Sequence, residues 1–119
     1  VLFFYPKADT PGCTKQACAF RDALAGIRAL NAEVYGISAD SAEDQAAFHA
    51  RHRLNFTLLA DPGAEVIERF GAKMPLLKMS KRWTFILDPE LRVRWIEQDV
   101  DPLIDARRVA EELSRLQRP

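Results

Sequence analysis

The first five residues, Val1–Tyr5, form an unbroken run of apolar side chains that ends at Pro6. A run of this length, rich in β-branched and aromatic residues, is typical of a strand buried on both faces of a parallel sheet. Thr10 and Pro11 follow a short polar turn and predict a helix with Thr10 as its N-cap and Pro11 as its first residue. Apolar residues then recur every three or four positions to about Leu30. The strand therefore leads directly into an amphipathic helix.

The rest of the chain repeats this alternation of strands and helices. Ser41 and Asp44 predict a capped helix start, and Gly71 predicts a helix end. We expect residues 72–81 to form a basic, irregular loop. The order β-α-β-α-β-α-β-β-α predicts an α/β fold, with a mixed sheet that carries helices on both faces in the thioredoxin-like arrangement. The expected strands are 33–38, 56–59, 83–87 and 91–96, and the expected helices are 41–51, 66–70 and 104–116.

Length and charge exclude several classes of protein. The 119 residues suffice for a single domain, and Lys+Arg and Asp+Glu both total 17, so the formal net charge is zero. No basic stripe is available to bind nucleic acid. The longest apolar runs fall far short of the roughly 20 residues that a membrane-spanning helix needs. With no signal peptide visible, we expect a cytoplasmic protein with neither nucleic acid nor membrane as a partner.

The two cysteines point to redox chemistry. Two are too few for a disulfide-stapled scaffold, and Cys13 and Cys18 stand five positions apart. Cys13 falls in the first turn of the predicted helix, where unpaired N–H groups and the positive end of the helix dipole favour a thiolate. Gly12 allows a reactant to approach the backbone closely, and Thr10 supplies a hydroxyl near the sulfur.

The spacing of Cys13 and Cys18 limits how they can react with each other. Five residues of α-helix correspond to about 140 degrees of rotation and a rise of about 7.5 Å, which separates the Cα atoms by roughly 8 to 9 Å. A disulfide requires Cα atoms within about 7 Å. If both thiols lie on one intact helix, a functional disulfide requires that helix to unwind locally. The spacing thus predicts a redox cycle with a conformational step.

The segment of residues 1–22 resembles the peroxiredoxins, whose active-site pattern Pro-x-x-x-Thr-x-x-Cys is matched by Pro6, Thr10 and Cys13. The run Thr-Pro-Gly-Cys-Thr and the second cysteine five residues later are similar to the bacterioferritin comigratory protein, or peroxiredoxin Q, subfamily. The similarity continues through residues 36–41, 55–61 and 82–88. It implies a thioredoxin-like fold and thiol-dependent reduction of hydrogen peroxide and organic hydroperoxides. It also implies thioredoxin or a similar dithiol as reductant, and neither cofactor nor metal.

The resemblance assigns roles to individual residues. Cys13 resembles the peroxidatic cysteine, which becomes a sulfenic acid, and Cys18 resembles the resolving cysteine that condenses with it. Thr10 would hydrogen-bond the thiolate and the incoming peroxide, and Pro6 would shield the sulfenate from solvent. The backbone amides of Gly12 and Cys13 would point at the reacting oxygens.

Two further residues are matched by the resemblance. Arg82, at the start of the expected strand 83–87, matches the family's distant arginine, whose guanidinium stabilises negative charge on the sulfur and on the leaving oxygen. Gln16 matches a position that helps to orient this arginine and the substrate. The loop 72–81 replaces a longer loop that contains glycine and tyrosine in the family. The family usually begins with a β-hairpin and a first strand that this sequence does not contain, so we expect residues 1–119 to be a single thioredoxin-like domain without them.

Other interpretations of the same residues remain open. The chain could be a peroxide sensor that relays its oxidation to a client protein, or a non-catalytic thioredoxin-like binding module with an unactivated Cys13. Cys18 could be an ordinary core residue, and Arg82 an exposed residue at a strand edge. His49 and His52 could share a metal with the cysteines, but we expect surface histidines because zinc sites need four ligands. We expect a monomer, since no dimerisation segment is evident.

Overall fold

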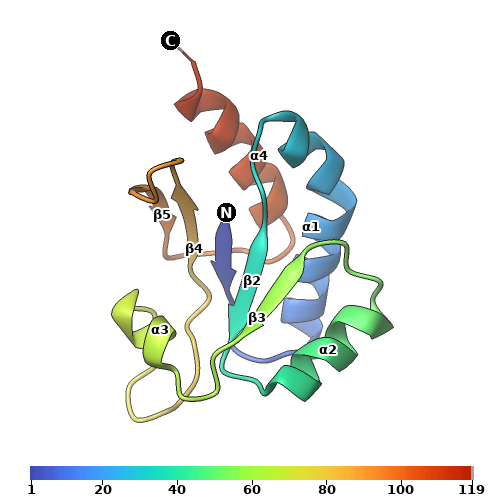
Figure 1. Cartoon of the computed structure of the whole chain (residues 1–119), viewed down its shortest axis with the longest axis vertical. Coiled ribbons are helices and arrows are strands. Elements are labelled where there is room, and N and C mark those ends of the chain that lie inside the picture. Colours follow the sequence, from blue (N-terminus) through green and yellow to red (C-terminus); the bar gives the residue numbers. More distant parts are fainter. Residues whose placement is uncertain (119) are drawn as a thin grey trace.

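The computed structural model describes residues 1–118, which fold around one mixed sheet of five strands (Figure 1). The strands have the spatial order β3-β2-β1-β4-β5. Neighbours β1, β2 and β3 run parallel, whereas β4 pairs antiparallel with both β1 and β5. In chain order the elements are β1 (Leu2–Phe4), α1 (Pro11–Ala29), β2 (Tyr35–Ser38), α2 (Ala42–Arg51), β3 (Thr57–Ala60), α3 (Glu65–Arg69), β4 (Thr84–Leu87), β5 (Val93–Glu97) and α4 (Asp105–Leu116).

The central strand β1 divides the apolar core into two layers, because successive side chains of a strand point to opposite faces. Phe3 and Tyr5 face the larger cluster, which includes residues of α1 and α4 together with Phe48 of α2. Phe4 faces the smaller cluster, in which Ile67 of α3 covers the opposite side of the sheet. Helices α1 and α4 pack against each other (Figure 1). The expected mixed sheet with helices on both faces is confirmed.

The expected helix boundaries agree with the structure to within a residue or two. Ser41 caps α2 by accepting a hydrogen bond from the Asp44 amide at 3.1 Å, as the sequence predicts. Gly71 ends α3 in the left-handed conformation with a φ of 78°, and its amide bonds the carbonyl of Glu68. The following amide bonds the carbonyl of Ile67, which completes a Schellman motif.

One expectation about local structure is wrong. Residues 72–81 are not an irregular loop but a small hairpin, in which Lys73 bridges Ser80 and the amide of Met74 bonds the carbonyl of Met79. Backbone pairing across the turn organises the hairpin and leaves Leu76 fully exposed at its tip. The prediction that Thr10 is the N-cap of α1 and Pro11 its first residue is confirmed, although the Thr10 side chain forms no capping hydrogen bond.

In the part of the chain that the structure describes, we find no helix that combines the length and the apolar character required to cross a membrane.

Candidate active site

Cys13 lies in the first turn of α1, three residues after the end of the loop that follows β1. Its side chain is 1% exposed and belongs to the larger core cluster. The first intrahelical hydrogen bond of α1 runs from the amide of Thr14 to the carbonyl of Thr10. The amides of Gly12 and Cys13 precede it, so the helix provides them with no acceptor. The first turn of α1 thus contains a buried sulfur and two backbone donors without helical acceptors, at the positive end of the helix.

The Arg82 guanidinium contacts this sulfur. Its Nη2 lies 3.3 Å from Cys13 Sγ, and its Nη1 donates to Gln16 Oε1 at 2.7 Å. Arg82 lies two residues before β4, which begins at Thr84, one residue later than expected. The amide of Phe4 bonds the carbonyl of Trp83 at 2.8 Å, which ties the chain next to Arg82 to the end of β1. Residues far apart in the sequence are thereby brought to one sulfur atom.

A second layer of side chains fixes the amide of Gln16. Gln16 Nε2 donates to Asp105 Oδ2 at 3.0 Å, and Thr84 Oγ1 donates to the same oxygen at 2.7 Å. Because an ionised carboxylate only accepts, Asp105 takes the NH₂ end of the amide, and Gln16 Oε1 is left to face Arg82. Burial raises the pKa of the Asp105 carboxyl, against the smaller lowering effect of the bonds from Thr84 and Gln16. The line of contacts runs from Cys13 through Arg82 and Gln16 to Asp105.

Gly12 makes room for the guanidinium. A Cβ atom added at residue 12 would lie 3.1 Å from Arg82 Nη2 and 3.8 Å from Pro102 Cγ. The first of these distances is tighter than ordinary van der Waals contact. The sequence predicts that Gly12 admits a reactant, whereas the group closest to it in the structure is the chain's own Arg82.

Pro6 and Thr10 lie in the loop between β1 and α1. The Thr10 hydroxyl does not hydrogen-bond the sulfur of Cys13. Thr10 Oγ1 donates to the carbonyl of Lys7 at 2.7 Å, so its one proton is used within the loop. This replaces the bond to the thiolate that the resemblance implies. Pro6 is half-buried at the end of β1.

Cys18 lies on the same unbroken helix as Cys13, and both thiols are free. The prediction that both cysteines share one helix is confirmed. Cys18 is half-buried and is not a member of either core cluster. On an intact helix their Cα atoms stay roughly 8 to 9 Å apart, beyond the reach of a disulfide.

Sequence reasoning missed Asp105 and Thr84. The helix dipole by itself favours an acidic residue in the first turn of a helix. Asp105 at the start of α4 therefore did not stand out in the sequence as a site residue. Its near-complete burial, with 1% exposed, marks it in the structure. Thr84 resembled an ordinary strand residue, although its hydroxyl donates to one oxygen, Oδ2, of the buried Asp105 carboxylate.

The two histidines make separate contacts. His49 Nε2 lies 3.0 Å from the carbonyl oxygen of Phe56, and His52 Nε2 lies 3.0 Å from Asp9 Oδ1. Within residues 1–118, no three or more His, Cys, Asp or Glu side chains are grouped so that they could hold a metal ion.

Comparison with known proteins gives a consistent result. The sequence model of the AhpC/TSA family matches residues 1–96. Peroxiredoxin Q, chloroplastic, from Triticum aestivum is 46% identical over 97 residues, which are 81% of this chain and 45% of that protein. Its counterpart from Arabidopsis thaliana is 45% identical over 89 residues, which are 74% of this chain and 41% of that protein. The chain thus spans less than half the length of these curated relatives.

Solved structures agree with the sequence comparison. Peroxidoxin BcpB from Mycobacterium tuberculosis superimposes with a TM-score of 0.91 and 37% identity, over 99% of this chain and 79% of that one. The bacterioferritin comigratory protein of Xanthomonas campestris superimposes with a TM-score of 0.93 and 26% identity, over 98% of this chain and 78% of that one. The expected thioredoxin-like fold is confirmed by these likenesses.

Proposed function

Because the chain belongs to the AhpC/TSA family and resembles its peroxiredoxin Q members, we propose that it is a cysteine-dependent peroxidase with Cys13 as the reacting residue. The observation that carries the proposal is the 3.3 Å contact between Arg82 Nη2 and Cys13 Sγ. We also propose that residues 1–119 act as one thioredoxin-like domain, since a single sheet runs through the described part of the chain.

The first step is attack of the Cys13 thiolate on a peroxide. The S–O bond forms as the O–O bond breaks, the sulfur becomes a sulfenic acid, and the leaving alkoxide or hydroxide takes up a proton. The Arg82 guanidinium is beside the sulfur to stabilise the thiolate and then the charge that moves to the leaving oxygen. Gln16 and Asp105 act behind it as positioning residues, since they fix the orientation of Arg82.

The residues around the sulfur complete the proposed site. The amides of Gly12 and Cys13 bind the reacting oxygens because α1 leaves them without acceptors. Pro6 shields the sulfenate from solvent. For Thr10 to bind the peroxide, its hydroxyl must turn away from the Lys7 carbonyl, to which it donates in the resting protein.

The second step joins the two sulfurs. The Cys18 thiol attacks the sulfur of the sulfenic acid, the S–O bond breaks, the S–S bond forms and water leaves. Since both cysteines lie on one intact helix, α1 must unwind around them before this step. A dithiol reductant then returns the disulfide to two thiols.

The proposed substrates are hydrogen peroxide and alkyl hydroperoxides, and the proposed reductant is thioredoxin or a similar dithiol. Alkyl peroxide reduction activity is ascribed to the similar bacterioferritin comigratory protein of Xanthomonas campestris, which supports this substrate class. We propose that the protein acts as a monomer. A cytoplasmic location stays a prediction, since the similar plant proteins are called chloroplastic.

Steady-state turnover tests the proposal. Peroxide consumption is followed with thioredoxin, thioredoxin reductase and NADPH, for the wild-type protein and for Cys13→Ser and Cys18→Ser. We expect sustained turnover by the wild type, none by Cys13→Ser, and loss of thioredoxin-dependent turnover by Cys18→Ser. Consumption that stops after one equivalent of peroxide would instead favour the sensor that relays its oxidation. If the wild type consumes no peroxide, the proposal is overturned, and the non-catalytic binding module becomes the favoured interpretation.

A further inference from the structure

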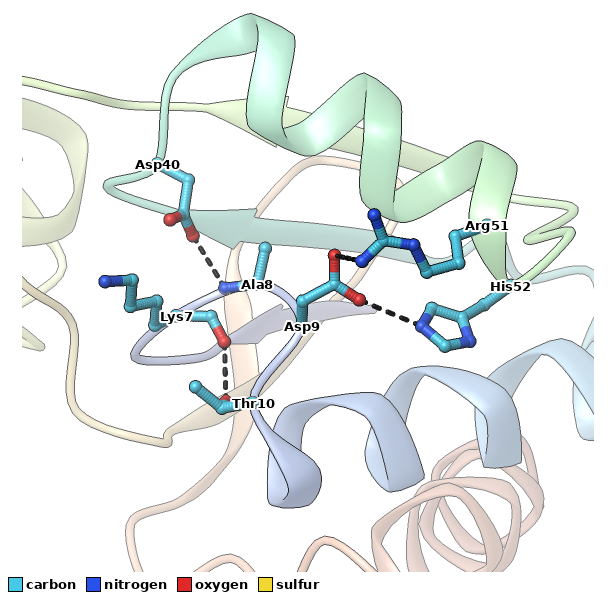
Figure 2. A network of polar contacts seen from close by, with 7 residues as sticks. All are labelled: Lys7, Ala8, Asp9, Thr10, Asp40, Arg51 and His52. Carbon is cyan, nitrogen blue, oxygen red and sulfur yellow. Dashed lines mark hydrogen bonds and ion pairs between the residues drawn. The ribbon is translucent and has the colours of Figure 1, made fainter.

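The loop between β1 and α1 is held by side chains from outside the helix that carries the sulfur (Figure 2). The amide of Ala8 donates to Asp40 Oδ2 at 2.8 Å. The Asp9 carboxylate lies between two residues at the C-terminal end of α2, with Oδ2 2.6 Å from Arg51 Nη1 and Oδ1 3.0 Å from His52 Nε2. Because a carboxylate only accepts, His52 Nε2 carries a proton in this contact. Both oxygens of Asp9 thus accept from donors at the C-terminal end of α2, the last helical residue Arg51 and the C-cap residue His52.

Asp9 needs such an anchor. Its φ of 62° lies in the left-handed region, which is unfavourable for a residue with a Cβ atom, although aspartate and asparagine tolerate it better than most. Asp9 immediately precedes the N-cap residue Thr10 and lies four positions before Cys13. The anchor therefore fixes the direction in which the chain enters the first turn of α1.

The segment just after α2 also holds α1 beyond the second cysteine. Arg21 Nη1 donates to the carbonyl of His52 at 2.6 Å, and Asn55 Nδ2 donates to the carbonyl of Arg21 at 3.2 Å. Residues 10–20, which contain both cysteines, therefore have each of their ends tied to one place in the fold. This segment is also the one that must unwind before the disulfide can form.

We propose that Asp9, held by Arg51 and His52, is a positioning residue that keeps the first turn of α1 wound while Cys13 reacts with peroxide. This inference rests on the proposed peroxidase cycle. Unwinding this turn moves the loop and breaks the Asp9 contacts, whereas the Arg21 contacts lie beyond the unwound segment. The anchor therefore has opposite effects on the two steps. It speeds formation of the sulfenic acid by holding Cys13 beside Arg82, and it slows formation of the disulfide by adding to the cost of unwinding.

The test measures the two steps separately. Wild type, Asp9→Asn and Arg51→Gln are mixed with hydrogen peroxide, quenched at successive times and analysed by mass spectrometry for sulfenic acid, disulfide and sulfinic acid. Asparagine is chosen because it tolerates the left-handed conformation of residue 9. We expect sulfenic acid to form more slowly and the disulfide to form faster, each by about two- to fivefold, as the loss of a partly exposed ion pair predicts. At high peroxide the sulfinic fraction should fall.

Two further variants separate positioning from general stability. Arg51→Lys keeps a positive charge near Asp9 and should restore both rates to within about twofold of wild type, since exposed ion pairs differ little in energy. Glu33→Gln removes a comparable ion pair, between Glu33 and Arg28 of α1, at the opposite end of that helix from Cys13. It should leave both rates unchanged.

The possible results lead to different conclusions. Unchanged rates in Asp9→Asn and Arg51→Gln, or a parallel fall in both steps, would overturn the positioning role while leaving the peroxidase intact. A wild-type protein that forms no sulfenic acid would overturn the proposed function and this inference with it.

Discussion

The reactivity that we propose for Cys13 depends on one side chain that contacts it and on two that act through that contact. Arg82 contacts the sulfur, Gln16 holds Arg82, and Asp105 decides which end of the Gln16 amide faces the guanidinium. Each link uses one donor and one acceptor, so a change at the far end alters the orientation at the near end. The chemistry of one sulfur atom is therefore distributed over α1, the segment just before β4, and α4.

The close approach of Gly12 and Arg82 gives a first prediction. In Gly12→Ala the added Cβ would stand 3.1 Å from Arg82 Nη2 and displace the guanidinium from Cys13. We expect sulfenic acid formation to slow about tenfold, or about 1.4 kcal/mol, as for a weakened charged hydrogen bond. Stability measured by urea unfolding should change by less than about 1 kcal/mol, because alanine is the better helix former.

Gly26→Ala is the control for this variant, since a Cβ at residue 26 of the same helix meets nothing within 4 Å. Its rate should equal that of the wild type. A Gly12→Ala protein that reacts as fast as Gly26→Ala would show that the position of the guanidinium does not set the rate.

The raised pKa of Asp105 gives a second prediction. Its ordinary value is 3.8, and burial raises it, so the folded protein binds this proton more tightly than the unfolded chain does. The stability that this contributes is fully present below the unfolded pKa and is lost as pH rises through the folded pKa. Asp105→Asn cannot titrate. The free energy of unfolding of wild type minus that of Asp105→Asn should therefore fall as pH rises from about 4.

Urea unfolding of both proteins across this pH range provides the measurement, and subtraction removes the titrations that the two share. A difference that stays constant, or that grows with pH, would contradict the assignment of a raised pKa to Asp105.

At the scale of elements, the sheet places the site by bringing distant segments to the end of β1. The amide of Phe4 bonds Trp83 next to Arg82, and the amide of Tyr5 bonds Ile37 at the end of β2. The side chain of Phe3, on the same strand, stacks on Phe20 of α1 with ring centroids 4.6 Å apart. The packing of α1 on β1 thus fixes where Cys13 stands relative to Arg82.

Gly36 in β2 is required for this packing, which gives a third prediction. A Cβ added at residue 36 would lie 2.8 Å from Phe3 Cζ and 2.8 Å from Leu58 Cδ2. The Phe3 ring cannot move freely because Phe20 stacks on it, so Gly36→Ala should lose about 1 to 3 kcal/mol of stability through overpacking. Gly26→Ala should instead gain about 0.5 to 1 kcal/mol in the same urea experiment. Equal stability of the two variants would contradict the packing argument.

The elements that periodicity defines could be predicted from the sequence, and those that tertiary pairing defines could not. The apolar run at the start and the spacing in α1 indicated the central strand and its helix, because both signals are local. Hairpin 72–81 was expected to be irregular, since its pairing depends on backbone contacts that leave no apolar pattern. Cys13 carried a signal in its neighbours Thr10 and Gly12, whereas Asp105 gained its importance through burial that no local pattern reveals.

At the scale of the whole molecule, one face of the sheet combines stability and proposed chemistry. The larger core cluster, which includes Cys13, also contains the contacts between β1, α1 and α4. The segment that must unwind for the second proposed step is therefore part of the main core, and its ends are tied to α2. The proposed cycle requires a fold that stays intact while one part of a single helix opens.

The most direct test of the central claim is the intact mass of the reduced protein after one equivalent of hydrogen peroxide, for the wild type, Cys18→Ser and Cys13→Ser. The account predicts loss of two hydrogens in the wild type, gain of one oxygen in Cys18→Ser and no rapid change in Cys13→Ser. Slow and equal oxidation of all three proteins would contradict it, because Cys13 would then be an ordinary buried thiol.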